Sequence, residues 1–420
     1  MTIAILGYGK EGKSVKNYFK DEEIKIFDNF TDDELKNLNL SNFSLVFRSP
    51  SVKPFDKSWT SVTKYFFDNC ICPIIGITGT KGKGTTASLI AAILKSLDKT
   101  VHLVGNIGFP AIDILDKIQP TDIVVYELSS FQLWDLGVSP HISVILRIEP
   151  DHLNIHKNFD DYVFAKSNIA KFQEKSDSCI FFKDNESSQK IANLSPAKKF
   201  PYPLTEKSPK LTELLNSLNI PGKHNQENAE AALLAVSAIF KTPLETFISE
   251  NFDHLKSTFE NFKGLPHHIE FIRELNGVKY YDDNFSASSS SLEVAIKTFP
   301  NSPVFLIAGG KDRNLDLTPH KTAIFGSPNI KKVFLIGEIK EKLAKNEDEN
   351  RFEFCDTLED AVHQARLLAE EEYEHYDSSA FDNKKPSPIV LMSPGAASFD
   401  MFENFYDRGM QFQSLVKELK

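Results

Sequence analysis

The chain has 420 residues, of which 41% are hydrophobic and 25% charged, so it is long enough for two or three globular domains. Its formal net charge of -10 argues against a general nucleic-acid binder, which would carry a basic face. The apolar run at the N-terminus is too short for a signal peptide, and no apolar run reaches the length of a membrane span. We therefore expect a cytoplasmic protein that binds neither nucleic acid nor membranes. A monomer is our working expectation, although the sequence itself is silent on the oligomeric state.

Three blocks of the sequence repeat one order of elements: a short β-branched apolar run, a glycine turn and a helical pattern. They begin with "TIAILGYGKEGKSVKNYF", near "CPIIGITGT" and near "GLPHHIEF". This alternation predicts an α/β protein with parallel sheets. We expect three domains, at residues 1–73, 74–263 and 264–420. The first and last are expected to be Rossmann-like, and the middle one to be a parallel sheet like that of P-loop ATPases.

The first block contains G-x-G-x-x-G at Gly7, Gly9 and Gly12, between a predicted strand and a predicted helix, and Asp28 ends the next strand. This pattern is typical of dinucleotide sites, in which glycines let backbone N–H groups approach a pyrophosphate. A tight strand–helix turn without a ligand is the alternative, and the motif alone does not decide between the two.

The second block contains "GITGTKGKGTTAS", residues 76–88, between an apolar run typical of a buried strand and an amphipathic helix. Successive N–H groups of such a loop can cradle phosphate oxygens while Lys83 meets the terminal phosphates. A hydroxyl residue that binds Mg²⁺ normally follows this lysine. Gly84 follows it here, with Thr85 and Thr86 directly after it. Two alternatives stay open at this point: a one-residue insertion that passes the magnesium role to Thr85, and a turn that binds no nucleotide. The predicted ATP-binding residues of the loop are Gly79, Thr80, Lys81, Gly82, Lys83, Gly84, Thr85 and Thr86.

Polar groups end two further strands of this block: Glu127 ends "DIVVYE", and Asp151 and His152 end "SVILRIEPDH". Open α/β sheets bind their ligands at the carboxyl ends of their strands. A carboxylate and an imidazole near a P-loop suit Mg²⁺, although imidazole is an uncommon ligand of that ion. A single histidine after a strand is usually structural, but the coincidence of three such groups favours a magnesium–nucleotide site.

Over essentially its whole length the chain resembles the Mur ligases. The motifs that carry the resemblance occur in the family's order: "GITGTKGKGTT", "GNIGFPA", "YELSSFQL", "DHLNIH", "YVFAKSNIA", "HNQENAEAALLA", "GLPHHIEF", "GGKDRNLDL" and "SPGAASFDMFENFYDRG". "ELSSFQL" and the "SPGAAS" segment resemble the members that add D-glutamate to UDP-N-acetylmuramoyl-L-alanine. The loop, with glycine after its lysine, is similar to that of the related folylpolyglutamate ligases, whose next hydroxyl residue binds magnesium.

The resemblance implies ATP-driven amide formation in peptidoglycan precursor synthesis, through an acyl phosphate that an amine attacks. The implied ligands are ATP, two Mg²⁺ ions, a UDP-linked muramoyl substrate and a free amino acid. Lys83 would hold the β- and γ-phosphates, with Thr85 and Glu127 on a first Mg²⁺ and His152 on a second. Lys166 matches a lysine that the family carbamylates to make a metal ligand, whereas its sequence pattern alone favours a surface lysine.

Further residues match binding positions of the family. On the ATP side these are Asn225, Asn228, His268 and Asp283. The residues implied to bind the UDP-linked substrate or the amino acid are Lys10, Glu11, Asp28, Asn106, Arg313, Ser398 and Phe405. The first glycine motif would then hold UDP and not NAD.

Four positions depart from the family's pattern. His268 replaces an arginine expected on the γ-phosphate, and Arg313 replaces a lysine that faces the amino acid's side-chain carboxylate. Phe285 and Ala287 stand where a lysine and a threonine would help to bind the amino acid. Two alternatives therefore stay open: a Mur-type or folylpolyglutamate-type ligase with another amino acid or acceptor, and a nucleotide-binding regulator without catalytic activity.

Overall fold

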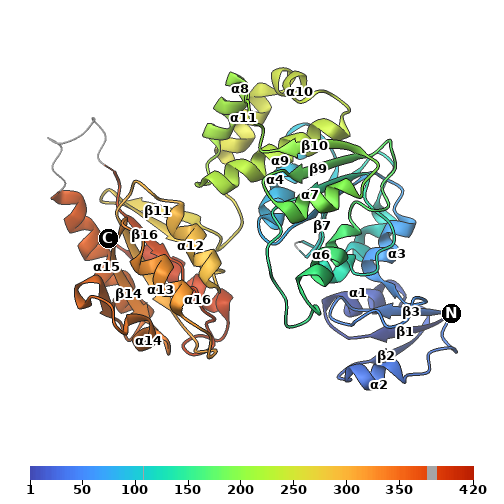
Figure 1. Cartoon of the computed structure of the whole chain (residues 1–420), viewed down its shortest axis with the longest axis horizontal. Coiled ribbons are helices and arrows are strands. Elements are labelled where there is room, and N and C mark those ends of the chain that lie inside the picture. The colour runs from blue at the N-terminus through green and yellow to red at the C-terminus, as the bar shows by residue number, and fades with distance from the viewer. Residues whose placement is uncertain (107, 376–385) are drawn as a thin grey trace. The chain divides into compact units, whose positions relative to one another are not determined.

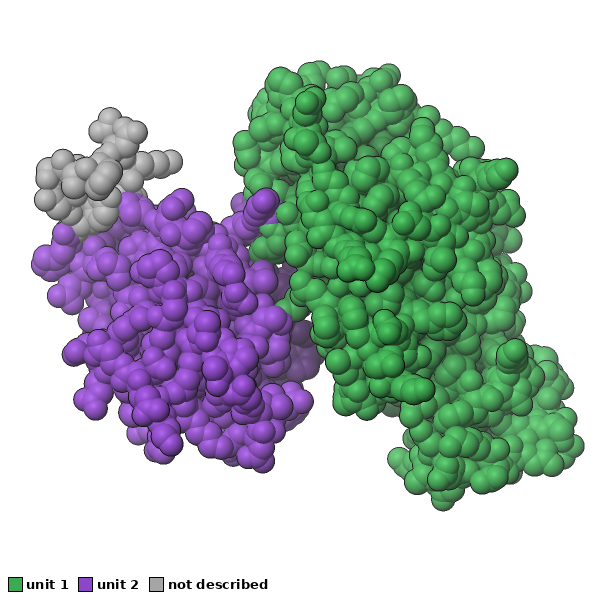
Figure 2. Space-filling model, in the orientation of Figure 1, with its two compact units in different colours: residues 1–218, 224–262 green, residues 219–223, 263–420 purple. Residues whose placement is uncertain are grey.

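The computed structural model describes residues 1–106, 108–375 and 386–420, and Figure 1 labels its helices and strands. The described chain contains three sheets, of four, six and six strands. It divides into two compact units (Figure 2): residues 1–218 with 224–262, and residues 219–223 with 263–420. The first two sheets belong to the first unit and the third sheet to the second. The predicted α/β class, with three sheets rich in parallel strands, is confirmed.

The first sheet has four parallel strands in the order β2-β1-β3-β4. Its central strand β1 alternates between two small cores, with Ile3 and Ile5 in one and Ala4 and Leu6 in the other. This alternation follows from the two-residue repeat of a strand covered on both faces. The elements are β1 (Thr2–Leu6), α1 (Lys10–Tyr18), β2 (Glu23–Phe27), α2 (Asp32–Lys36), β3 (Leu45–Arg48), β4 (Thr60–Ser61) and α3 (Val62–Asn69).

The second sheet has six parallel strands in the order β10-β9-β8-β5-β7-β6. Its strand β5 is buried throughout, with Ile75 and Ile77 in the core that α4 and α9 cover and Ile74 in the core on the other face. The strands are β5 (Ile74–Thr78), β6 (Val101–Gly105), β7 (Ile123–Glu127), β8 (Ile142–Ile145), β9 (Ser178–Phe182) and β10 (Lys198–Tyr202). The helices are α4 (Lys83–Ser96), the 3-10 helix η1 (Ala111–Lys117), α5 (Ser130–Leu133), α6 (Phe159–Ser167), α7 (Glu186–Asn193), α8 (Pro209–Ser217), α9 (Lys223–Ile239), α10 (Leu244–Glu250) and α11 (Phe252–Asn261).

The third sheet has the order β11-β12-β16-β13-β14-β15, in which only the β11–β12 pair is antiparallel. Helices α12, α13 and α14 cover one face, and α15 and α16 cover the other. The strands are β11 (Glu270–Leu275), β12 (Val278–Asp282), β13 (Val304–Gly309), β14 (Ile330–Ile336), β15 (Phe352–Phe354) and β16 (Ile389–Met392). The helices are α12 (Ser289–Lys297), α13 (Thr318–Phe325), α14 (Lys340–Ala344), the 3-10 helix η2 (Glu349–Arg351), α15 (Leu358–Glu374) and α16 (Phe405–Glu418).

Among the described helices, none taken singly has both the length and the hydropathy of a membrane span. Helices α9 and α10 meet these criteria only as a pair, across a bend of 91°. Most residues of α9 are buried in the core of the second sheet.

Arg48, the last residue of β3, joins the first sheet to the second. Its guanidinium is fully buried, and it forms an ion pair with Asp135, which follows α5. Its Nη1 also donates to the carbonyl oxygen of Val52 at 3.1 Å. Two side-chain bonds from α1 add to this joint: Ser14 donates to Asp113 at 3.1 Å and Tyr18 donates to Asp116 at 2.7 Å. These contacts hold the glycine turn of the first sheet against the second sheet.

We predict that Arg48→Ala lowers the free energy of unfolding of this unit by about 3 kcal/mol, because it leaves the Asp135 carboxylate without its partner. The expected loss lies at the low end of the range for buried pairs because the Asp135 side chain is 25% exposed. Both tryptophans, Trp59 and Trp134, lie in this unit, so urea unfolding followed by tryptophan fluorescence measures it.

Lys64→Ala is the matched control, because Lys64 pairs with Asp68 on the surface of α3 and such pairs contribute at most about 1 kcal/mol. Equal effects of the two substitutions would contradict a structural role for the buried ion pair.

Candidate active site

The predicted phosphate-binding loop joins β5 to α4. Gly82, which precedes α4, has a φ of +83°, a conformation that favours glycine. A Cβ atom at this position would lie 2.6 Å from Oδ1 of Asn228 on α9. Asn225 and Asn228 are buried, with Nδ2 of Asn228 3.4 Å from Oδ1 of Asn225. Glycine therefore allows α9 to approach the loop, which brings the two predicted ATP-binding asparagines beside it.

Lys83 is the first residue of α4, and its side chain lies inside the loop. Its Nζ donates to the carbonyl oxygens of Gly79 at 3.1 Å and Thr80 at 3.0 Å. Burial lowers the pKa of Lys83, while the nearby carboxylates of Glu127 and Asp151 act in the opposite direction. Lys83 is half-buried next to the backbone N–H groups that begin α4, where a phosphate can meet both.

Two threonines follow in the first turn of α4. Thr85, the predicted magnesium ligand, is half-buried. Thr86 is fully buried, and its hydroxyl has no hydrogen-bond partner among the described residues. The turn therefore offers two hydroxyl groups beside the anion-binding amides.

Lys166 lies on α6, and the surface position favoured by its sequence pattern is wrong. The side chain is buried, and Nζ donates to the carbonyl oxygen of Gly79 at 2.9 Å and to Oγ1 of Thr78 at 3.3 Å. It also lies 4.6 Å from the centre of the Tyr162 ring. Burial and the charge of Lys83 hold the pKa of Lys166 well below its usual value. The reason for the difference is that α6 packs its lysine-bearing side against the end of β5.

Glu127 and His152 follow two strands that both pair with β5. The Glu127 side chain is buried; Oε1 accepts from Nδ2 of Asn106 at 3.4 Å, and Oε2 has no hydrogen-bond partner among the described residues. Burial raises the pKa of Glu127, and Lys83 and Lys166 partly offset this rise. The His152 side chain is 48% exposed, and its ring packs edge-on against Phe131 at 5.1 Å between centres.

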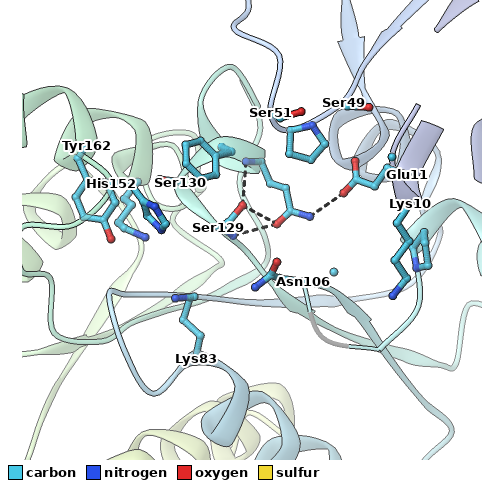
Figure 3. A pocket seen from close by; sticks show the side chains of 17 residues that line it. Lys10, Glu11, Ser49, Ser51, Lys83, Asn106, Ser129, Ser130, His152 and Tyr162 are labelled. Atoms are coloured by element: carbon cyan, nitrogen blue, oxygen red, sulfur yellow. Dashed lines mark hydrogen bonds between the residues drawn. The ribbon is translucent and has the colours of Figure 1, made fainter. Parts of the chain in front are cut away.

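A cleft of about 440 Å³ lies where the first two sheets meet (Figure 3). It brings together six of the predicted site residues: Lys10, Glu11, Lys83, Asn106, His152 and Lys166. Asp28 does not line this cleft. Its exposed carboxylate accepts from the backbone N–H of Tyr8 at 3.3 Å and so supports the glycine turn.

Two further segments line the cleft without having been predicted as site residues: residues 49–51 and residues 129–132. In the second segment, Ser129 and Gln132 form a capping box at the start of α5, and Gln132 Nε2 donates to Oε1 of Glu11 at 3.0 Å. A capping pattern directly after strand β7 was the available signal.

The second unit contains the remaining predicted residues. Asp283 follows β12, is buried, and accepts from the Ser393 hydroxyl at 2.7 Å. Ser398 is buried, and its hydroxyl has no hydrogen-bond partner among the described residues. Arg313 is exposed and lines a cavity of about 20 Å³ together with Ala287. This unit therefore brings Arg313 beside one of the positions that depart from the family's pattern.

The other departures form an aromatic cluster in the same unit. The His268 ring stacks on Phe285 with 4.6 Å between ring centres, and Phe405 packs edge-on against Phe285 at 4.4 Å. Tyr406 contacts both phenylalanines. Phe285 thus fills the space beside Phe405 with an apolar ring where the family has a lysine.

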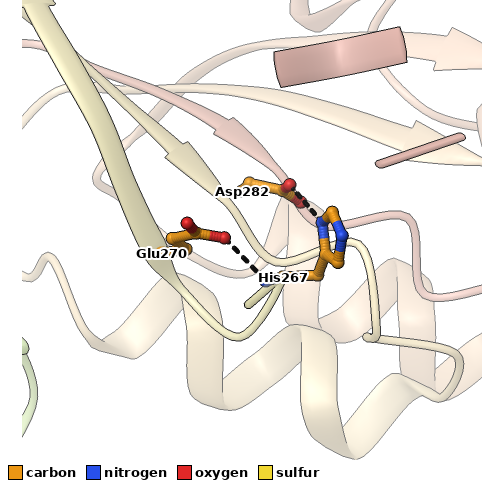
Figure 4. A group of neighbouring side chains, drawn as sticks. All are labelled: His267, Glu270 and Asp282. Carbon is orange, nitrogen blue, oxygen red and sulfur yellow. Dashed lines mark hydrogen bonds and ion pairs between the residues drawn. The ribbon is translucent and has the colours of Figure 1, made fainter. Parts of the chain in front are cut away.

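A polar cluster of His267, Glu270 and Asp282 lies at the turn that contains His268 (Figure 4). Nδ1 of His267 lies 2.6 Å from Oδ2 of Asp282, and the His267 backbone N–H donates to Oε2 of Glu270 at 2.9 Å. Their ligand atoms lie within 4.8 Å of one another, a donor set that a divalent ion could use. However, the Gln413 amide also donates to both carboxylates, and Asp282 raises the pKa of His267. We therefore interpret the cluster as an ion-pair network that stabilises the turn, in which His267 has a φ of +60°.

The sequence was compared with known families and proteins. The profile of the Mur ligase middle domain matches residues 77–208. The UDP-N-acetylmuramoylalanine–D-glutamate ligase of Clostridium kluyveri is 33% identical over 407 residues, which cover 91% of this chain and 84% of that protein. The enzyme of the same name from Clostridium tetani is 29% identical over 450 residues, covering 97% and 92%.

Solved structures share the fold. The UDP-N-acetylmuramate-alanine ligase of Thermotoga maritima superposes with a TM-score of 0.59 at 14% identity over the full length of both chains. The folylpolyglutamate synthase of Mycobacterium tuberculosis, solved with ADP, gives 0.60 at 13% identity and covers 97% of this chain and all of that one. These likenesses show the fold that the chain shares with both proteins. The chain belongs to the Mur ligase family, the ATP-dependent amide ligases of peptidoglycan synthesis.

Proposed function

We propose that this ligase joins D-glutamate to UDP-N-acetylmuramoyl-L-alanine. The observation that carries the proposal is the shared cleft, because Lys83, His152 and Lys166 line it together with Lys10 and Asn106. Such a cleft suits the phosphates of ATP at one end and a UDP-linked acid at the other. The name shared by the curated relatives supports D-glutamate as the amino acid.

The reaction begins with transfer of the γ-phosphoryl group of ATP to the carboxylate of the UDP-linked substrate, which gives an acyl phosphate and ADP. The amine of the amino acid then attacks the acyl carbon, and phosphate leaves from the tetrahedral intermediate as the amide forms. In this scheme Lys83 and the N–H groups at the start of α4 hold the transferred phosphoryl group and stabilise its charge. Most of the rate enhancement then comes from positioning the two reactants.

Two Mg²⁺ ions fit the residues near the end of β5. Glu127 has a buried Oε2 without a hydrogen-bond partner among the described residues, Thr85 lies in the first turn of α4, and His152 is half-exposed at the cleft. We propose Thr85 and Glu127 as ligands of one ion and His152 as a ligand of the other. When bound, Mg²⁺ neutralises charge on the phosphates.

We also propose that Lys166 is carbamylated. Its lowered pKa increases the fraction of neutral Nζ, and a neutral amine adds to CO₂ with loss of one proton to give a carbamate. The product is an anionic group beside Glu127 that can act as a further metal ligand, and it would compensate the charge of Lys83.

The division of labour that we propose follows the predicted domains: residues 1–73 for the UDP-linked substrate, 74–263 for ATP and 264–420 for the amino acid. Within the last segment, Arg313 can grip a side-chain carboxylate with two hydrogen bonds. The buried hydroxyl of Ser398, without a partner among the described residues, supports a role in binding a carboxylate. Phe285 and Ala287 replace residues that the resemblance implies in amino-acid binding, so the identity of the amino acid has to be tested directly.

We predict that the protein releases phosphate from ATP only when UDP-N-acetylmuramoyl-L-alanine and an amino acid are both present. In a panel of D-glutamate, L-glutamate and D-aspartate, we expect the highest kcat/KM with D-glutamate, measured by coupled phosphate release and by detection of the amide product. A different preferred amino acid would correct the proposed specificity. Phosphate release that does not depend on any amino acid would refute the reaction.

We predict that Lys166→Ala lowers kcat by about 100-fold or more, because it removes the carbamate that we propose as a ligand of the metal ions that neutralise phosphate charge, and that added bicarbonate does not restore it. Lys171→Ala is the matched control, because Lys171 is an exposed lysine that follows α6 by a few residues. Circular dichroism melting curves check that both variants fold. Activity of Lys166→Ala close to that of Lys171→Ala would show that the carbamate assignment is wrong.

A further inference from the structure

Glu11 occupies an unusual position in the cleft. It lies in the first turn of α1, and its Oε1 accepts from Nε2 of Gln132 at 3.0 Å (Figure 3). Its Oε2 is buried and has no hydrogen-bond partner among the described residues. One half of the carboxyl group is therefore fixed by α5, and the other half has a hydrogen-bonding capacity that the described residues do not use.

Burial disfavours a carboxylate at Glu11 more than the nearby positive charges favour it. Arg48 lies near but is committed to its ion pair with Asp135, and Nζ of Lys10 donates to the carbonyl oxygen of Gly108 at 3.0 Å. The buried phenol of Tyr126 also lies close enough to interact with Glu11, and it adds no positive charge. Burial raises the pKa of Glu11 to about 7, although Gln132, Arg48 and Lys10 act to lower it. The first turn of a helix normally stabilises a carboxylate, so burial is the dominant effect here.

The ligand expected in this part of the cleft makes an ionised Glu11 still less favourable. A UDP-linked substrate carries two negative charges on its diphosphate. A carboxylate shielded from water beside such a ligand would repel it, because charge interactions are stronger in a site of low dielectric constant. A neutral carboxylic acid avoids this repulsion and has an O–H group to donate.

We propose that Glu11 binds the UDP-linked substrate as a neutral carboxylic acid and that its Oε2–H donates a hydrogen bond to the substrate. This inference rests on the proposed function. Glu11 is thus a specificity-determining residue for the nucleotide substrate, and substrate binding is linked to one proton. Since the protonated form binds, the affinity is constant at low pH and falls as the pH rises above the pKa of the free enzyme.

The test measures the Kd of UDP-N-acetylmuramoyl-L-alanine by isothermal titration calorimetry between pH 6 and pH 8.5, without ATP. The diphosphate of this substrate is a diester and does not titrate in this range. For the wild type we expect Kd to rise by about tenfold or more over this interval, as the neutral acid is lost at up to tenfold per pH unit. Repeating the titrations at pH 8 in buffers of different ionisation enthalpy should show uptake of close to one proton per substrate bound.

Glu11→Gln keeps a neutral donor that cannot ionise. We expect its Kd at pH 6 to stay within about threefold of the wild type, since one amide replaces one O–H donor, and to be nearly independent of pH. Glu23→Gln, on an exposed residue of β2, should behave like the wild type. The histidines and lysines of the cleft remain in all three proteins, so the difference between them isolates Glu11.

Wild-type binding that is independent of pH, or an equally steep pH dependence in Glu11→Gln, would overturn the role of Glu11 and leave the proposed reaction intact. Failure of the wild type to bind the substrate at any pH would instead overturn both. If Glu11→Gln does not fold, the proton uptake of the wild type on substrate binding tests the proposal by itself. Absence of proton uptake at pH 8 would show that Glu11 does not bind the substrate as a neutral acid.

Discussion

The site depends on one constraint: two lysines and one carboxylate lie together, buried or half-buried, at the carboxyl end of the central strand of a parallel sheet. Lys166 and Glu127 are buried and Lys83 is half-buried. The charges of Lys83 and Glu127 shift each other's pKa toward the charged form, and the charge of Lys83 lowers the pKa of Lys166. An isolated charge in such a place is strongly unfavourable. The three side chains are therefore stable there only as a set. Lys83 is the cation of this set and suits phosphate, the substrate group that the ligase family handles, whereas the carbamate that we propose at Lys166 would make that side chain an anion.

The parts of this arrangement that follow from local sequence were predictable. A strand, a glycine turn and a helix define the loop at residues 76–88, and the rule that parallel strands end at one edge brings Glu127 and His152 near it. The roles of these residues stay predictions, whereas their meeting at one edge is a property of the fold. The domain limits at residues 73 and 263 also stay predictions.

Other parts depend on contacts between segments far apart in the chain, which no local pattern encodes. The burial of Lys166 depends on how α6 packs beside β5. From the sequence alone, a lysine in a helical pattern is expected to be exposed to solvent. The approach of Asn228 to Gly82 depends on α9, more than a hundred residues downstream by number. The contact between Gln132 and Glu11 joins two sheets. Phe285 was recognisable in the sequence as a departure from the family's pattern. Its packing was not: only the structure shows that the rings of His268 and Phe405 contact the phenylalanine that stands in place of the lysine.

The ion pair of Arg48 with Asp135 has a consequence for chemical design. It helps to join the first two sheets into one compact unit, which contains both the glycine turn at residues 7–12 and the loop at residues 76–88. A single compound that links a uridine-like head to a phosphate mimic would engage both ends without having to order one sheet against the other. Its second contact would form at high effective concentration, so the tether length becomes the variable to optimise.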